Sequence, residues 1–145
     1  MMMALYVMGV ISILVIYSDC RYRRITNNLC AIIFFVSLYL AVEGDNIPMH
    51  FISGLIVFLS TVTLVKFNIF GAGDSKLATA FSIALLPSQI IDAVILTLLF
   101  GGVLAGLYLI KDRLVLNKKR DDERGLPYGV AISLGFYITI IGNSI

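Results

Sequence analysis

Two aspartates, Asp19 and Asp74, lie at the edges of apolar runs, where a carboxylate needs a physical explanation. A charge at the centre of a bilayer costs about 2.5–3.5 kcal/mol on insertion scales, so acidic residues at membrane depth are rare and usually functional. Asp19 closes the first apolar run, and Asp74 follows Gly71-Ala72-Gly73. Two carboxylates that meet can hydrolyse a bond, because one takes a proton from water while the other, protonated, polarises a carbonyl.

A simpler explanation is that each aspartate is a hydrated boundary residue that pairs with a nearby Arg or Lys. The glycines before Asp74 weigh against it, because glycine is unfavourable inside a helix. Gly71 and Gly73 therefore predict an unwound backbone. Irregular backbone at membrane depth is tolerated where it is buried in protein or lines a wet cavity. The pattern indicates a loop that brings a carboxylate into such a cavity.

The composition indicates a membrane protein. Of the 145 residues, 59% are apolar and 14% are charged, whereas an average soluble domain carries about 25% charged residues. We expect an all-α, polytopic bundle of helices that forms a single domain over residues 1–145, with no separate soluble domain. Cys20 and Cys30 have neither a CxxC nor a metal-ligand spacing and are interpreted as small apolar residues.

Six apolar segments are predicted, each a candidate to cross a hydrocarbon core of about 30 Å. They cover residues 1–18, 29–42, 49–65, 76–86, 89–110 and 127–144. The first has no basic n-region and no small-residue cleavage site, so it is interpreted as a membrane helix and not as a cleaved signal peptide. The fourth is the shortest, because Pro87 ends it.

The distribution of charge predicts the topology. With six crossings, all 11 Lys and Arg residues lie at one membrane face. The other face carries Glu43, Asp45 and Asp92 but no basic residue. By the positive-inside rule the basic face is cytoplasmic and both termini are outside. Asp19 and Asp74 then lie at similar depth, at the cytoplasmic ends of their helices.

Three motifs, taken together, resemble those of the type IV prepilin peptidases and archaeal preflagellin peptidases. Residues 71–77, Gly-Ala-Gly-Asp-Ser-Lys-Leu, resemble the GxGD-x-K-L signature of that family. Asp19, followed by a basic stretch with Arg24 and then by Ile25 and Asn27, resembles its first motif, which ends in I-P-N. Thr26 replaces the proline of that motif, which should loosen the turn without removing any chemistry.

The third motif precedes the last apolar segment. Residues 126–131, Leu-Pro-Tyr-Gly-Val-Ala, resemble the family's third block, whose core of proline, aromatic residue and glycine is Pro127, Tyr128 and Gly129 here. The chain lacks the Cys-rich N-terminal region of the longer members, which also methylate the product. It is similar to the short, peptidase-only branch associated with Flp-type (tight adherence) pili.

The resemblance implies an intramembrane aspartic endopeptidase of the cell inner membrane, with no cofactor and no metal. Its substrate would be a prepilin, with a short basic leader, a Gly-containing cleavage site and a membrane helix. Cleavage without methylation would occur at the cytoplasmic face, with the substrate locally extended, and the unwound Gly71–Gly73 segment would offer backbone groups to it. The catalytic pair would be Asp19 and Asp74, supported by Gly71, Gly73, Lys76, Asn27, Arg24, Pro127, Tyr128 and Gly129.

Individual roles follow from position. Asp74 opens a helix, where the dipole favours the anion, and Asp19 closes one, which predicts Asp74 as base and Asp19 as acid, although the arginines after Asp19 oppose this. Asn27 is predicted to cap the second helix. Lys76 would hold the cytoplasmic end of its segment or contact substrate. Pro127 fits the first turn of the last helix, and close packing explains Gly129.

Other functions have weaker support. A proton-coupled transporter would need acidic groups at successive depths, and a non-catalytic pilus assembly component would not need both aspartates. A GxGD protease with other substrates is a further alternative. The sequence has no P-loop and no HExxH motif, and no nucleic-acid partner is expected. His50 is predicted to lie at the opposite face. Gly102 and Gly106 match GxxxG, which leaves internal packing or a homo-oligomer open.

Overall fold

The structure is a computed structural model that describes residues 1–44, 46–111 and 126–144. Within these residues the chain forms helices and no strand, as predicted. The elements are α1 (Met2–Tyr22), α2 (Asn27–Glu43), α3 (Ile47–Lys66), α4 (Ala72–Ser82), the short 3-10 helix η1 (Pro87–Gln89), α5 (Ile90–Ile110) and α6 (Tyr128–Ser144).

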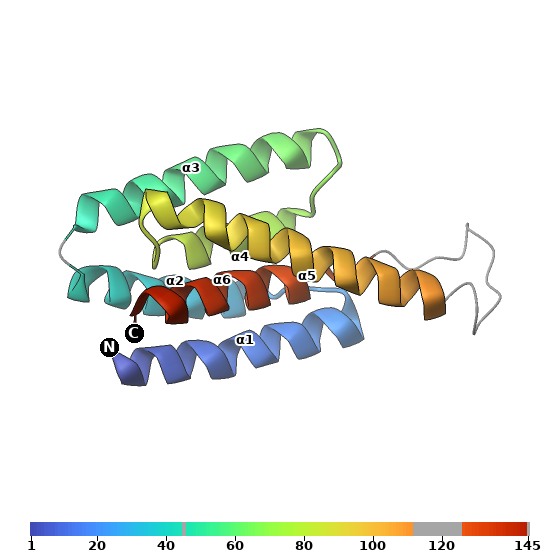
Figure 1. Cartoon of the computed structure of the whole chain (residues 1–145), viewed down its shortest axis with the longest axis horizontal. Helices are drawn as coiled ribbons and strands as arrows, with labels where there is room; N and C mark the ends of the chain where they lie inside the picture. The colour runs from blue at the N-terminus through green and yellow to red at the C-terminus, as the bar shows by residue number, and fades with distance from the viewer. Residues whose placement is uncertain (45, 112–125, 145) are drawn as a thin grey trace.

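Consecutive long helices run in opposite directions, so both termini lie at the same end of the bundle (Figure 1). The other end receives the ends of α1, α3 and α5 and the starts of α2, α4 and α6. Every Lys and Arg of the described ranges lies at or near these helix ends: Arg21, Arg23, Arg24, Lys66, Lys76 and Lys111. We call it the basic end. The charges predicted in the loop from 112 to 125 lie outside the described residues.

The surface of the bundle is apolar, as expected for a membrane protein. Helices α1 and α3, and the continuous helical stretch Pro87–Ile110, are long and apolar enough to cross a membrane, whereas α2 and α6 are shorter apolar helices. Large side chains of α5 point outward, with Leu98 66% exposed and Val103 64% exposed. Apolar surface this extensive is unfavourable in water, so these side chains are suited to contact lipid.

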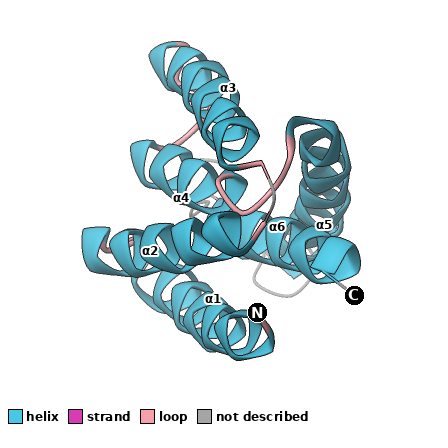
Figure 2. Cartoon of the chain, turned by 90° about the vertical axis from the view of Figure 1, so that its left-hand side faces the viewer, coloured by secondary structure: helices cyan, strands magenta, loops and turns pink. Residues whose placement is uncertain are grey.

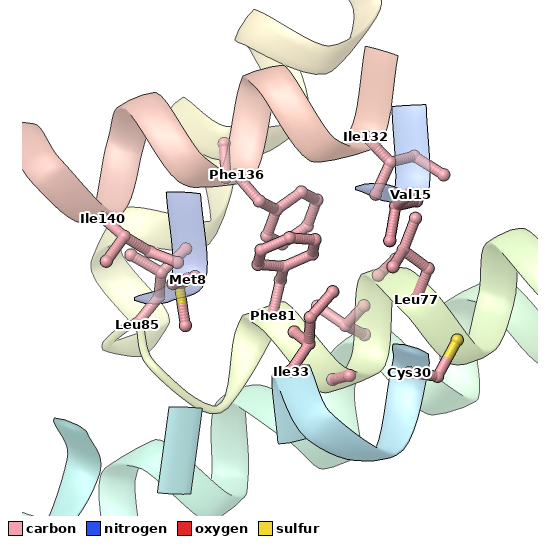
Figure 3. Packing of buried hydrophobic residues seen from close by; sticks show 14 of the residues in the cluster. Met8, Val15, Cys30, Ile33, Leu77, Phe81, Leu85, Ile132, Phe136 and Ile140 are labelled. Carbon is pink, nitrogen blue, oxygen red and sulfur yellow. The ribbon is translucent and has the colours of Figure 1, made fainter. Parts of the chain in front are cut away.

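The short helix α4 lies at the centre of the bundle and packs against α2, α3 and α6, while α6 also contacts α1 and α5 (Figure 2). An 11-residue helix rises only about 16 Å, so α4 alone does not span the bilayer. The rings of Phe81 and Phe136 stack at the middle of the core with their centroids 6.1 Å apart (Figure 3). The core thus fixes α4 against α6. Both helices begin at the basic end.

Two helix boundaries differ from those predicted. Helix α1 continues past residue 18 to Tyr22, because polar and charged residues do not end a helix by themselves. Arg23 ends it, with φ 52° and ψ 35° and its backbone N–H bonded to the Asp19 carbonyl oxygen at 3.0 Å. Helix α4 begins at Ala72 instead of Lys76 and ends at Ser82, before Pro87. Both aspartates therefore lie inside helical turns.

We expect Gly135→Ala to destabilise the fold. A Cβ atom at Gly135 would lie 2.6 Å from the backbone nitrogen of Thr97, where α6 crosses α5, and a backbone cannot rotate away. Overpacking of this kind costs about 1–3 kcal/mol. The matched control is Gly102→Ala, because a Cβ there meets nothing within 4 Å. Thermal unfolding in detergent should show a lower Tm for Gly135→Ala alone, and equal Tm values would contradict the close crossing.

Candidate active site

Asp19 and Asp74 line one cavity of about 250 Å³ at the basic end of the bundle. Its walls come from the end of α1, the start of α4 and the start of α6, and its lining consists of Asp19, Arg23, Ile25, Gly71, Gly73, Asp74, Leu126 and Tyr128. The volume leaves room for several water molecules, each of which occupies about 30 Å³ in the liquid. Two aspartates from distant parts of the sequence therefore line one cavity that is large enough to hold water.

Asp19 is 6% exposed and lies in the last helical turns of α1, directly against the first turn of α6. A Cβ atom added to Gly129 would lie 2.7 Å from Asp19 Oδ2, so only glycine leaves room for the carboxylate there. Within the described ranges Oδ2 is buried and has no hydrogen-bond partner. The N-terminal end of a helix favours a negative charge, so α6 stabilises the ionised form of Asp19.

Asp74 lies in the first turn of α4, and its carboxylate folds back over Gly71. A Cβ atom at Gly71 would lie 2.7 Å from Asp74 Oδ2. The prediction of an unwound Gly71–Gly73 segment is correct only for Gly71, which is extended with φ −76° and ψ 143°. Ala72 and Gly73 are helical, because the first turn of a helix tolerates glycine next to a well-packed neighbour. Gly73 makes only an ordinary contact with Ile25.

A buried hydrogen bond fixes α4 against α3 next to Asp74. The hydroxyl oxygens of Thr61 and Ser75 are 2.8 Å apart, and both side chains are buried. Hydroxyl pairs between membrane helices orient the helices that they join. Neither residue was predicted from the sequence, where the signal is only a hydroxyl beside the GxGD aspartate and another hydroxyl in an apolar helix.

The predicted cap at Asn27 is wrong. Thr26 is the N-cap residue of α2, and no side chain caps it. The Asn27 side-chain oxygen instead accepts a hydrogen bond from Lys76 Nζ at 3.0 Å, which joins α2 to α4. Lys76 therefore holds its segment, one of its two predicted roles. The cap fails because Asn27 is already the first helical residue and a cation from another helix lies beside it.

Of the remaining predicted residues, one lines the cavity and two do not. Tyr128 lines the cavity, and its ring packs edge-on against Phe70 with the centroids 6.1 Å apart. The Arg24 side chain is exposed and does not line the cavity, although its carbonyl oxygen accepts a hydrogen bond from the Ser18 hydroxyl at 2.7 Å. Pro127 is fully buried and directly precedes α6 instead of lying in its first turn.

Arg23 lines the cavity and was not among the predicted site residues. Its guanidinium lies over the ring of Tyr108, 5.3 Å from the centroid. The sequence held no signal that separates Arg23 from Arg21 and Arg24, because the separation depends on the left-handed turn that ends α1.

No cluster of three or more His, Cys, Asp or Glu residues exists in the part of the chain that the structure describes. His50 lies near the start of α3, at the end of the bundle opposite the aspartates, where its Nδ1 is 3.0 Å from the carbonyl oxygen of Ile83. The arrangement at the basic end is thus a pair of carboxylates beside an arginine. Two carboxylates at one cavity have the groups that acid–base activation of water requires.

A family model matches most of the chain. The model of the type IV leader peptidase family matches residues 6–110, which include both aspartates and the GxGD motif. The chain therefore belongs to the type IV leader peptidase family, whose members are aspartic peptidases. As such, it is a membrane-associated hydrolase with prepilin substrates. Comparison with curated proteins and with solved structures gave no match.

Proposed function

We propose that the chain removes the leader peptide of a Flp-type prepilin at the cytoplasmic face of the inner membrane, with Asp19 and Asp74 as the catalytic pair. The observation that carries the proposal is that Asp19 and Asp74 both line one cavity at the basic end. The positive-inside rule puts that end in the cytoplasm of a multi-pass protein. The basic leader of a prepilin is then on the same side as the two carboxylates.

The surroundings of the two aspartates favour Asp19 as the base, which reverses the assignment made from the sequence. That assignment rested on Asp74 opening a helix and Asp19 closing one. The N-terminal end of α6 now lies against the Asp19 carboxylate, so both carboxylates have a helix N-terminus beside them. Arg23 lines the same cavity as Asp19, and a positive charge there favours an ionised carboxylate. Two carboxylates in one cavity repel each other when both are ionised, so one of them keeps a proton. If Asp19 is the ionised one, the proton is on Asp74. A neutron structure with the proton on Asp19 would contradict this assignment.

The reaction then needs four proton transfers, two as water adds to the carbonyl and two as the C–N bond breaks. Asp19 takes a proton from water as the oxygen attacks the scissile carbonyl carbon, and Asp74 gives its proton to the carbonyl oxygen. The tetrahedral diol that results loses a proton to Asp74, the C–N bond breaks, and Asp19 returns its proton to the leaving amine. Both carboxyl groups finish in their starting forms, as hydrolysis requires.

The substrate reaches the cavity as an extended segment, because a helical peptide bond is shielded from attack. The extended backbone at Gly71 directly precedes α4 and lines the cavity, so it is the part of the predicted unwound segment that is suited to lie beside a substrate strand. Proline substitutions through the cleavage site should therefore slow cleavage. Unchanged rates in that series would remove this part of the proposal.

The activity is tested with a co-expressed Flp-type prepilin and mass spectrometry of the mature pilin. We expect a product that has lost its leader at a Gly-containing site and whose new N-terminus carries no methyl group. A methylated N-terminus would contradict the peptidase-only assignment. Processing of type IVa prepilins but not of Flp-type prepilins would contradict the substrate class and leave the peptidase activity intact.

A further inference from the structure

Among the described residues that line the cavity, Arg23 is the cationic one, and no step of the hydrolysis above uses it. Its left-handed backbone, with φ 52°, turns the chain at the end of α1. The guanidinium lies 5.3 Å from the centroid of the Tyr108 ring, near the end of α5. A guanidinium over a tyrosine face is attracted to it, so the side chain is held in position at the cavity wall.

Two polar atoms at this cavity have no partner. Arg23 Nη1 and Asp19 Oδ2 are both buried, and neither makes a hydrogen bond within residues 1–44, 46–111 and 126–144. Asp19 and Arg23 do not form an ion pair with each other within that part of the chain. Buried polar groups without partners are rare in folded proteins and unfavourable. An unpaired donor on a residue that lines the cavity suggests a ligand that supplies an acceptor.

We propose that Arg23 is a substrate-binding residue of the peptidase and that its guanidinium donates a hydrogen bond to the carbonyl oxygen of the scissile peptide group. The inference rests on the proposed function, in which that carbonyl and the attacking water occupy the cavity. The carbonyl oxygen is the acceptor that Arg23 Nη1 lacks.

Arginine is suited to this contact for two reasons. It keeps its charge at every relevant pH, and its planar group presents donors in a fixed geometry. A fixed donor aimed at a carbonyl oxygen strengthens its interaction as negative charge develops there during attack. Arg23 therefore adds to the proton that Asp74 supplies, because the carbonyl oxygen has two lone pairs.

The test compares two peptides that span the cleavage site, one with the scissile amide and one with an (E)-alkene in its place. The alkene keeps the extended shape but has no carbonyl oxygen. Binding is measured in the Asp74→Asn background, so that the amide is not cleaved. Arg23→Gln should weaken binding of the amide peptide about tenfold, as expected for loss of one charge-assisted hydrogen bond, and leave the alkene peptide unaffected. Equal losses on both peptides, or none on either, would overturn the proposal.

Two further variants separate this role from a structural one. Arg21→Gln is the matched control, because Arg21 also lies over a tyrosine ring, that of Tyr22, but is exposed and does not line the cavity. It should change neither affinity. In the chain with both aspartates, Arg23→Gln should lower kcat/KM for cleavage, and Arg23→Lys should restore part of it.

The outcome also distinguishes this inference from the proposed function. If the Asp19→Asn and Asp74→Asn variants are inactive while Arg23→Gln cleaves at the wild-type rate, only the role of Arg23 is wrong. If an aspartate variant still cleaves normally, the proposed function is wrong, and the inference that rests on it is withdrawn as well.

Discussion

Asp19→Asn and Asp74→Asn are each expected to abolish prepilin cleavage while the protein stays in the membrane. The amide has nearly the shape of the carboxylate, so packing is preserved, but it can neither take a proton from water nor give one to the carbonyl oxygen. General acid–base catalysis contributes about 10²–10⁴-fold to a rate, and losing either partner should remove most of it. The measurement is the fraction of co-expressed prepilin that is processed, at matched membrane levels of each variant.

The control for this pair is Asp92→Asn. Asp92 lies in the first turn of α5, at the end of the bundle opposite the cavity. Asp92→Asn removes the charge of an acidic residue on a membrane helix and leaves the cavity unchanged. Processing of the prepilin should therefore stay at the wild-type level. Normal processing by either Asp19→Asn or Asp74→Asn would mean that the aspartate concerned is a hydrated boundary residue.

Gly129→Ala is expected to lower the cleavage rate by about 10²-fold, because a displacement of about 1 Å in a catalytic group can have that effect. The new methyl group would lie 2.7 Å from Asp19 Oδ2 and 2.9 Å from Ile25 Cδ1, so the carboxylate must leave its place against α6. Asp19 would then lose both its orientation toward the cavity and the favourable helix end. Steady-state cleavage of a prepilin peptide in detergent measures the effect.

The matched control is Gly142→Ala in the same helix, where an added Cβ meets nothing within 4 Å. It should cleave at the wild-type rate. The Tm of Gly129→Ala should also be recorded, since the proposal requires loss of activity in a protein that remains folded. A folded Gly129→Ala protein with full activity would show that Asp19 does not need its present position.

The pairing of the aspartates at one end of the bundle was predictable because it depends only on charge and helix count. The basic residues follow the first, third and fifth apolar segments and precede the second, fourth and sixth. With six membrane crossings, this pattern puts all of them at one face. The all-α class followed from the same segments and is confirmed. The short α4 was also recognised from Pro87, although its start at Ala72 was not, because Gly71 and Gly73 were interpreted as unwound backbone.

The contacts around the two carboxylates were not predictable, because they join residues far apart in the sequence. Gly129 was interpreted as a packing residue, and the group that it accommodates, the Asp19 carboxylate, comes from another helix. Asn27 has the side chain of a helix cap, but Lys76, 49 residues away, occupies its oxygen. Arg23 differs from its basic neighbours only through a left-handed turn and a ring on α5. Tertiary partners decided each of these roles.

Everything proposed for the site requires Asp19 and Asp74 to face the same cavity, and cross-linking tests that directly. In a chain with Cys20 and Cys30 replaced by Ser and Ala, the pair Asp19→Cys and Asp74→Cys should be joined by a short thiol-reactive cross-linker, detected as linked peptides by mass spectrometry. The pair Asp19→Cys and Asp92→Cys, at opposite ends of the bundle, should not be joined. Absence of the first link in a folded protein, or equal formation of both links, would contradict a shared aspartyl site.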